Sequence, residues 1–498
     1  MNCKILFARG LAGLAILIAV ITAPVWAGVV VTGPLTAVSG ASPFGPLSNC
    51  GNFPDGGQNF NNTEVEPWID VNPTNPDNVV SIWQQDRWSN GGSRGNVAGV
   101  SFDGGSTWQV VPIPGQTDCT GGDFDRASDP WVSFGPDGAL YQMSLLFDVP
   151  PKAERNAMAV SKSEDGGLTW SSPVLLIDNI DPPFFNDKNS LTADPTDANL
   201  VYAVWDRLES IGIFNFEGPV FFARSTDGGA SFDPAVEIHN PGLNNQTLGN
   251  QIVVAPSGIV YNFFNEINNF RPNGQPNLNP DVLAFKMSLN QGATWLPIGR
   301  SRRIVRMFPA AVATPDTGND VRDAAGLFDV AVDANSGALY AVFQDRRFTG
   351  FDQIALVTSS DGGRTWSTPI KVNQTPSTPG NPLRQQAFIP SVAVAGDGTV
   401  GVTYYDFRND DATGELADYW LVHCHANCGI AASWADEVRL TETSFDYLRA
   451  AQANGLFLGD YMGLATHPFD SQFRANFKQT VPPPGSDRSD GFFREAGP

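Results

Sequence analysis

Charged side chains recur at two corresponding points of a pattern that repeats along this 498-residue chain. Carboxyl groups can donate or accept protons, and a guanidinium group can hold a carboxylate through two hydrogen bonds. The first set lies at the ends of short apolar runs and comprises Asp86-Arg87, Asp206-Arg207, Glu266, Asp345-Arg346 and Asp406-Phe407-Arg408. The second set lies at the starts of the runs that precede these and comprises Glu66, Asp129, Asp187 and Asp460-Tyr461. If the runs converge, these residues predict an acid–base or anion-binding site, or else a collar of salt bridges between repeats.

The runs that must position these residues come in pairs separated by turn signals. The string WVSFGPDGALYQMSLLFD (131–148) is one such pair, divided at Asp-Gly. A third run and a fourth follow each pair, and four short antiparallel strands per repeat are typical of a β-propeller blade. Six full repeats lie between about Glu66 and Thr441, and GDYMGLAT (459–466) with FRANFKQ (473–479) forms a partial seventh. The sequence predicts an all-β propeller of six to seven four-stranded blades.

Between the third and fourth runs stands a recurring phrase, at intervals of about sixty to seventy residues. Its copies are SFDGGSTW (101–108), SEDGGLTW (163–170), STDGGASF (225–232), SLNQGATW (288–295), SSDGGRTW (359–366) and a degenerate NCGIAASW (427–434). Aspartate can accept hydrogen bonds from the N–H groups of a turn, and glycine allows a positive φ. We therefore expect Asp103, Asp165, Asp227 and Asp361 to hold hairpins, on the face opposite the charged residues.

The phrase S-x-D-G-G-x-T-W resembles the Asp box, or BNR repeat, of the sialidase superfamily. This resemblance implies a sialidase-like propeller that acts on glycans through an Asp acid/base, a Tyr–Glu nucleophile pair and arginines that grip a sugar carboxylate. Placed by position, the catalytic candidates are Asp187, Tyr405 and Glu266, and the substrate-binding candidates are Arg126, Arg207 and Arg408. The chain departs from the pattern because no F-R-I-P precedes the first Asp box. The string AFIPSV (387–392) comes late and lacks the arginine.

Two functions remain open on these residues. The first is glycan hydrolysis of the sialidase type, with a glycan or glycoconjugate as substrate. The alternative is a non-catalytic propeller that binds a glycan or an extracellular protein at the same mouth. Calcium-assisted binding would draw only on the acidic composition. We expect no cofactor, no metal site and a monomer.

The ends of the chain are expected to differ from the repeats. Lys4 and Arg9 precede an apolar run that ends near Ala27, which is the pattern of a cleaved signal peptide and predicts a secreted or periplasmic protein. We expect a signal over 1–27, an extension over 28–65 with a ring-closing strand, the propeller over 66–480 and a Pro/Gly-rich flexible tail over 481–498.

Cysteine content and charge further limit the function. Cys50, Cys119, Cys424 and Cys428 follow the signal, and export favours the local pairs Cys50–Cys119 and Cys424–Cys428. His423 and His425 within HCHANC leave zinc as an alternative. The net charge of −22 argues against nucleic acid and anionic membranes as partners, and we expect no membrane insertion.

Overall fold

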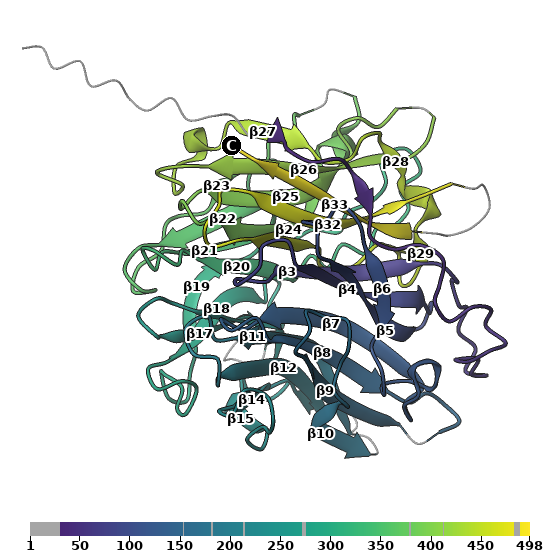
Figure 1. Cartoon of the computed structure of the whole chain (residues 1–498). Coiled ribbons are helices and arrows are strands. Elements are labelled where there is room, and N and C mark those ends of the chain that lie inside the picture. Colours follow the sequence, from purple (N-terminus) through teal and green to yellow (C-terminus); the bar gives the residue numbers. More distant parts are fainter. Residues whose placement is uncertain are drawn as a thin grey trace, which may run out of the picture.

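The computed structural model describes residues 30–152, 154–180, 183–212, 215–270, 275–377, 380–411, 413–482 and 489–498. Within these ranges the chain forms strands β1 to β33 and four short 3₁₀ turns, without an α-helix (Figure 1). None of the helical segments in the same ranges is long and apolar enough to cross a membrane. The predicted signal segment 1–27 lies outside the described residues.

Six consecutive antiparallel units of four main strands form blades 1 to 6, each beginning with its innermost strand, and the pairing of Ser93 with Ala127 joins the first two units into one eight-stranded sheet. Blade 1 is β3 (Glu64–Val71), β4 (Val79–Arg87), β5 (Ser93–Ser101) and β6 (Gln109–Pro112); blade 2 is β7 (Arg126–Phe134), β8 (Leu140–Phe147), β9 (Arg155–Ser163) and β10 (Val174–Ile180). Blade 3 is β11 (Phe184–Ala193), β12 (Val201–Ser210), β14 (Val220–Ser225) and β15 (Val236–His239); blade 4 is β16 (Gln246–Val254), β17 (Val260–Ile267), β18 (Asp281–Ser288) and β19 (Arg302–Arg306). Blade 5 is β20 (Phe328–Val332), β21 (Leu339–Asp345), β22 (Gln353–Ser359) and β23 (Ile370–Lys371); blade 6 is β24 (Ala387–Val394), β25 (Val400–Asp406), β26 (Leu416–Cys424) and β27 (Asp436–Arg439).

Shorter elements decorate these blades. They are β13 (Phe216–Glu217) on β12, β28 (Phe445–Asp446) on β26, the hairpin β29 (Ala451–Gln452) and β30 (Leu456–Phe457), and the turns η1 (Asp118–Thr120), η2 (Pro382–Gln385), η3 (Ala431–Ser433) and η4 (Tyr447–Arg449).

A seventh blade joins the two ends of the described chain. It contains β31 (Gly463–Thr466), β32 (Phe473–Thr480) and β33 (Ser489–Gly497), with β1 (Val30–Val31) and β2 (Thr36–Ala37) as its outer edge. Val30 pairs with Gly497 and Thr36 pairs with Phe493, which is the place of the ring-closing strand expected from 28–36. Figure 1 shows yellow β33 beside β32, with the purple N-terminal segment against them.

The flexible tail expected over 481–498 is therefore wrong for 489–497. The Pro- and Gly-rich string PPPG ends before this strand begins. Phe493 and Ala496 are buried in the seventh blade, so the strand has an apolar face with which to pack.

The seven innermost strands close a ring around an axis. Each contacts the next in the order β3, β7, β11, β16, β20, β24, β31 and again β3. All seven line one axial cavity of about 270 Å³. Side chains tie neighbouring strands together: Asp70 on β3 accepts a hydrogen bond from the Phe134 N–H of β7 at 2.7 Å, and Asp329 on β20 does so from Val392 of β24 at 2.8 Å. The propeller thus has seven blades, and contacts between neighbouring innermost strands close the ring.

The Asp-box hairpins form as the sequence predicts, at the end of the third strand of blades 1, 2, 3 and 5. The Asp103 carboxylate accepts hydrogen bonds from the Thr107 N–H at 2.8 Å and the Thr107 hydroxyl at 2.6 Å. Asp165, Asp227 and Asp361 make the same pair of bonds in their own turns. The second glycine also spaces the blades: a Cβ on Gly105 would lie 2.2 Å from the Phe493 ring of blade 7.

The four described cysteines form the two local disulfides, Cys50–Cys119 and Cys424–Cys428. The first links the extension before blade 1 to η1 after it. The second closes the degenerate sixth copy of the phrase, where Trp434 donates its indole N–H to the Cys428 carbonyl at 2.9 Å. These pairs are the ones that the sequence favours.

Candidate functional site

Bulges interrupt the starts of the inner strands on the face opposite the Asp boxes. In five blades the pairing with the second strand shifts register there. One residue of each bulge has a positive φ: Glu66 (53°), Asp129 (47°), Lys188 (46°), Gly249 (70°) and Ile389 (52°). Glycine adopts this conformation without strain, whereas the three charged residues do so at a cost of about 1–3 kcal/mol each. A bulge re-aims its side chain, and strain of this kind is concentrated at functional sites.

The three charged bulge residues meet at the ammonium group of Lys188. Its Nζ lies 3.3 Å from Asp129 Oδ2 and 3.4 Å from Glu66 Oε1. A third carboxylate, that of Asp460 before β31, lies 2.5 Å from the same Nζ. The Lys188 side chain is 12% exposed, and the three acidic side chains are each 4% exposed or less. Blades 1, 2, 3 and 7 therefore contribute to one buried ionic cluster at the mouth of the axis.

Two arginines flank this cluster. Arg322 binds Asp460 through two hydrogen bonds, from Nε at 2.9 Å and from Nη2 at 2.6 Å. Arg87, at the end of β4, donates a hydrogen bond to the Gln84 side chain at 2.6 Å. The guanidinium groups of Arg87 and Arg322 both lie over the ring of Phe457. These cations balance the carboxylates that Lys188 alone cannot neutralise.

A pocket of about 140 Å³ opens onto the cluster. Its lining includes the acidic residues Glu66, Asp129 and Asp187, the cations Lys188 and Arg322, and the aromatic residues Phe147 and Phe185. Asp187 is only half-buried, and no side-chain hydrogen bond to it is found among the described residues. It is thus the carboxyl group of the pocket that is least committed to the protein itself.

The carboxyl groups of the cluster differ in their affinity for protons. Burial raises the pKa of Asp187 to about 6, and the nearby charge of Asp129 adds to this shift while Lys188 opposes it. Burial likewise raises the pKa of Glu66 to about 8 against the pull of Lys188. Burial would also raise the pKa of Asp460, but Lys188 and Arg322 hold it well below its ordinary value. Carboxyl groups whose pKa values are pushed apart are the pattern of an acid–base pair.

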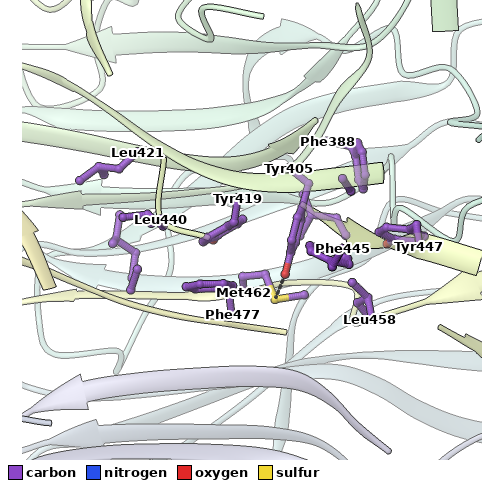
Figure 2. Packing of buried hydrophobic residues seen from close by; sticks show 14 of the residues in the cluster. Phe388, Tyr405, Tyr419, Leu421, Leu440, Phe445, Tyr447, Leu458, Met462 and Phe477 are labelled. Carbon is purple, nitrogen blue, oxygen red and sulfur yellow. Dashed lines mark hydrogen bonds between the residues drawn. The ribbon is translucent and has the colours of Figure 1, made fainter. Parts of the chain in front are cut away.

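Of the three predicted catalytic residues, only Asp187 lies in this pocket. Tyr405 is fully buried in the core between blades 6 and 7, where its hydroxyl donates to the Lys478 carbonyl at 2.5 Å and faces the Met462 sulfur (Figure 2). Burial, with Tyr419 nearby, raises the pKa of Tyr405 well above its ordinary value, the opposite of what a nucleophile needs. The expected nucleophile is therefore wrong, because Tyr405 alternates onto the packed face of β25.

The expected partner Glu266 is also placed elsewhere. Burial would raise its pKa, but hydrogen bonds from His239, Ser301 and Arg303 lower it to about 2. Its contacts are to blade 4 and to His239 of blade 3, and none of them involves Tyr405. Glu266 therefore cannot act on Tyr405 as proposed from position.

The three predicted arginines do not converge. Arg126 is buried against Asp55 at 2.5 Å and lies over the Trp88 ring. Arg207 stacks on the rings of Phe184 and Phe221, 3.7 and 4.7 Å from their centroids. Arg408 pairs with Asp406 and Glu437 within blade 6, at 2.5 Å each. Each arginine serves packing or pairing within its own region, so the expected arginine grip is wrong.

The alternative collar of salt bridges between blades is formed only in part by the predicted residues, since Glu266 binds His239 across the boundary of blades 3 and 4. Asp86 pairs with Arg94 and Asp345 with Arg347, both inside a single blade. The largest ionic tie between blades is that of Lys188, which joins blades 1, 2 and 7 to blade 3.

Sequence reasoning named Glu66, Asp129, Arg87 and Asp460 as mouth residues but assigned no role to Lys188 or Arg322. The sequence offers one signal for Lys188, which is that it directly follows the predicted mouth residue Asp187. Arg322 belongs to the long connection between β19 and β20, outside the repeat, so no periodic pattern marks it.

Neither a protein-family model nor a curated protein sequence matches the chain. Among solved structures, a protein of unknown function from Dyadobacter fermentans aligns with a TM-score of 0.50 at 13% identity, over 94% of this chain and 99% of the other. The Hadza microbial sialidase Hz136 aligns with a TM-score of 0.42 at 15% identity, over 70% and 66%. A GH93 α-L-arabinofuranosidase of Fusarium graminearum, solved with arabinobiose, aligns with a TM-score of 0.43 at 12% identity, over 89% and 95%. Structural neighbours thus include sialidases and GH93 arabinofuranosidases at low identity.

Proposed function

We propose that this protein is a glycoside hydrolase whose active site is the mouth pocket lined by Glu66, Asp129 and Asp187. The observation that carries the proposal is the unequal environment of these carboxyl groups. Asp187 is uncommitted to other side chains and has its pKa raised to about 6, while Asp129 lies 3.3 Å from a lysine ammonium. Glycoside hydrolysis usually requires one carboxylic acid and one carboxylate at the same bond.

In the proposed reaction Asp187 is the general acid. It donates its proton to the glycosidic oxygen as the bond from that oxygen to the anomeric carbon breaks. A water molecule forms the new bond to the anomeric carbon, and Asp129 accepts the proton that the water loses. The Ser128 hydroxyl, 2.6 Å from Asp129 Oδ1, would keep that carboxylate in place.

Lys188 and Asp460 are positioning residues in this scheme. The Lys188 ammonium binds Glu66, Asp129 and Asp460 at once, and Arg322 fixes Asp460 from the other side. The strained bulge conformations of Glu66, Asp129 and Lys188 persist because this network over-determines them.

Glycan binding without turnover is the second candidate. It is favoured by the same ammonium group, since the Lys188 Nζ lies 3.3 Å from Asp129 Oδ2 and competes with a water molecule for that oxygen. This reading keeps the ligand class and the pocket and removes only the chemical step.

The proposed setting is outside the cytoplasm. The two disulfides support it, because such bonds persist in oxidising compartments. The proposed partners are glycans or glycoconjugates.

The test is hydrolysis of a panel of fluorogenic glycosides, including sialosides and neutral sugars, followed by two variants. Asp187→Asn should lose more activity on substrates with poor leaving groups than on dinitrophenyl glycosides, because a good leaving group needs no proton. Asp129→Asn should lose activity on both kinds. A wild-type protein that binds glycans and cleaves none would favour the second candidate, and one that does neither would contradict both.

A further inference from the structure

We infer that a second cavity, the outer groove, binds the leaving-group side of an uncharged oligosaccharide. The outer groove is the space of about 580 Å³ lined by Phe147, Pro150, Glu154, Arg155, Pro183 and Phe185, among others. It shares Phe147 and Phe185 with the mouth pocket, so the two spaces adjoin along these rings. The inference deepens the proposed function and rests on it for the direction in which the glycan lies.

The sizes of the two cavities favour a ligand that extends between them. The mouth pocket holds about 140 Å³, below the roughly 300–1,000 Å³ that is usual for small-molecule sites. The outer groove, at about 580 Å³, lies within that range. A single small unit can fill the pocket, and most of the contact area available to a ligand belongs to the groove.

Strand β11 sets the direction of the glycan. Phe185 and Asp187 are two residues apart, so they share one face of the strand, and both line the pocket. Asn186 points the other way and is held by Asn156, Asn179 and Trp205. Because the general acid must touch the leaving oxygen and Phe185 extends from that point into the groove, the groove receives the leaving part of the substrate.

The chemistry of the groove fits an uncharged sugar. Phe185 is 42% exposed, and with Phe147 and two prolines it offers apolar surface to the flat face of a ring. Among the described residues that line the groove, the one guanidinium is that of Arg155, and Asp178 binds it through two hydrogen bonds of 2.9 and 2.8 Å. The exposed carboxylate of Glu154 would repel an anionic unit.

Binding by calorimetry to full-length mature protein carrying Asp187→Asn tests the inference. The probes are neutral gluco-, manno-, xylo-, galacto- and arabino-oligosaccharides of two and four units, with sialyllactose as the anionic probe. We expect at least one series in which the tetrasaccharide binds roughly tenfold more tightly than the disaccharide, and sialyllactose to bind more weakly. Adding Phe185→Ala should abolish this advantage of chain length.

Phe102→Ala is the matched control, because Phe102 is 46% exposed and lies on the Asp-box face. It should leave the ratio of tetrasaccharide to disaccharide affinity unchanged. If Phe185→Ala fails to fold, Ser210→Tyr, which narrows the groove from the end of β12, should remove the advantage instead.

Equal affinity for both lengths, tighter binding of sialyllactose, or no binding by any probe would overturn the inference. Length-dependent binding by a wild-type protein that cleaves nothing would contradict hydrolysis and support the groove. Hydrolysis without any dependence of binding on chain length would support the proposed function and contradict the outer groove. The two proposals can therefore fail independently.

Discussion

Aspartates on the two faces of the propeller have opposite surroundings. On the Asp-box face, Asp227 is exposed and Asp361 half-buried, and hydrogen bonds led by Ser231 and Thr365 of their own turns lower their pKa values to about 2. At the mouth, Asp187 accepts no side-chain hydrogen bond from the described residues, and burial raises its pKa to about 6 although the Lys188 backbone N–H acts to lower it. The same side chain is therefore a committed hydrogen-bond acceptor on one face and an available acid on the other.

The two faces also differ in how far along the chain their contacts reach. An Asp box is satisfied within four residues, so each blade can carry its own copy. The mouth network joins Lys188 to Asp129, Glu66 and Asp460, which come from different blades. A motif whose contacts lie within one turn can be repeated in every blade. The mouth network depends on unlike residues from several blades, so it occurs at one place in the ring.

The largest expected effect is that of Asp187→Asn on turnover. Loss of the general acid should reduce kcat by about 10²- to 10⁴-fold on glycosides with poor leaving groups. Because the folded protein disfavours the ionised carboxylate, the variant should be at least as stable as the wild type at pH 7. Steady-state kinetics and thermal unfolding on the same samples check both. Full activity in the variant would show that Asp187 has no chemical role.

Asp460→Asn should have the largest effect on stability. It removes the buried carboxylate that Lys188 and Arg322 share, so that both largely covered cations lose their shortest ion pair, a loss of about 3–5 kcal/mol in the free energy of unfolding. Denaturant titration measures it. The control is Asp316→Asn, which breaks an exposed pair with Arg384 and should cost under about 1 kcal/mol. Similar losses of unfolding free energy in the two variants would mean that the ion pairs of the mouth cluster stabilise the protein no more than an exposed surface pair does.

The dependence of activity on pH should follow Asp187. Only its protonated form can donate, so kcat/KM should fall as pH rises through about 6. Its raised pKa means that the folded state binds this proton more tightly than the unfolded chain. The contribution of Asp187 to stability should therefore decrease between about pH 4 and pH 6, and Asp187→Asn should remove that decrease. A rate that rises through pH 6 would contradict the assignment.

Tyr405→Phe should affect folding only, and modestly. It deletes the hydrogen bond to the Lys478 carbonyl in a fully packed core, a loss of about 0.5–1.5 kcal/mol. Turnover by the folded variant should match the wild type. Loss of turnover with unchanged stability would restore Tyr405 as a nucleophile and would contradict its buried placement.

Asp165→Asn, on the Asp-box face, should have the smallest effect of all. Blade 4 already carries the substitution, since Asn290 accepts the equivalent bond from the Thr294 N–H at 3.0 Å. Activity should be unchanged and the melting temperature nearly so. Asp165→Ala, which removes the acceptor altogether, should lower the melting temperature further. If the asparagine variant lost activity, the separation of the two faces would fail.

Predictions from the sequence were most accurate where the information is local. The hairpins at Asp103 and its equivalents, the Cys424–Cys428 disulfide and the strand pairs of each blade depend on residues close in the chain. The prediction of a flexible tail failed at 489–497, because it relied on the Pro/Gly string before β33 and not on the apolar residues within that strand. It also failed for Tyr405, Glu266 and the three arginines, because position in a repeat says where a residue stands along its strand but not which groups face it.

The sequence by itself determined the all-β propeller, its blade pattern and the face on which unlike charged residues gather, since period-two strands and turn residues act over a few positions. Only the tertiary structure decided the number of blades, because the seventh is assembled from both ends of the described chain. It also decided which charges meet. The bulges turn Glu66, Asp129 and Lys188 toward the axis, and closure of the ring brings Asp460 and Arg322 to them from more than a hundred residues away. Burial of that cluster, which no local pattern encodes, is what sets the proton affinity of Asp187.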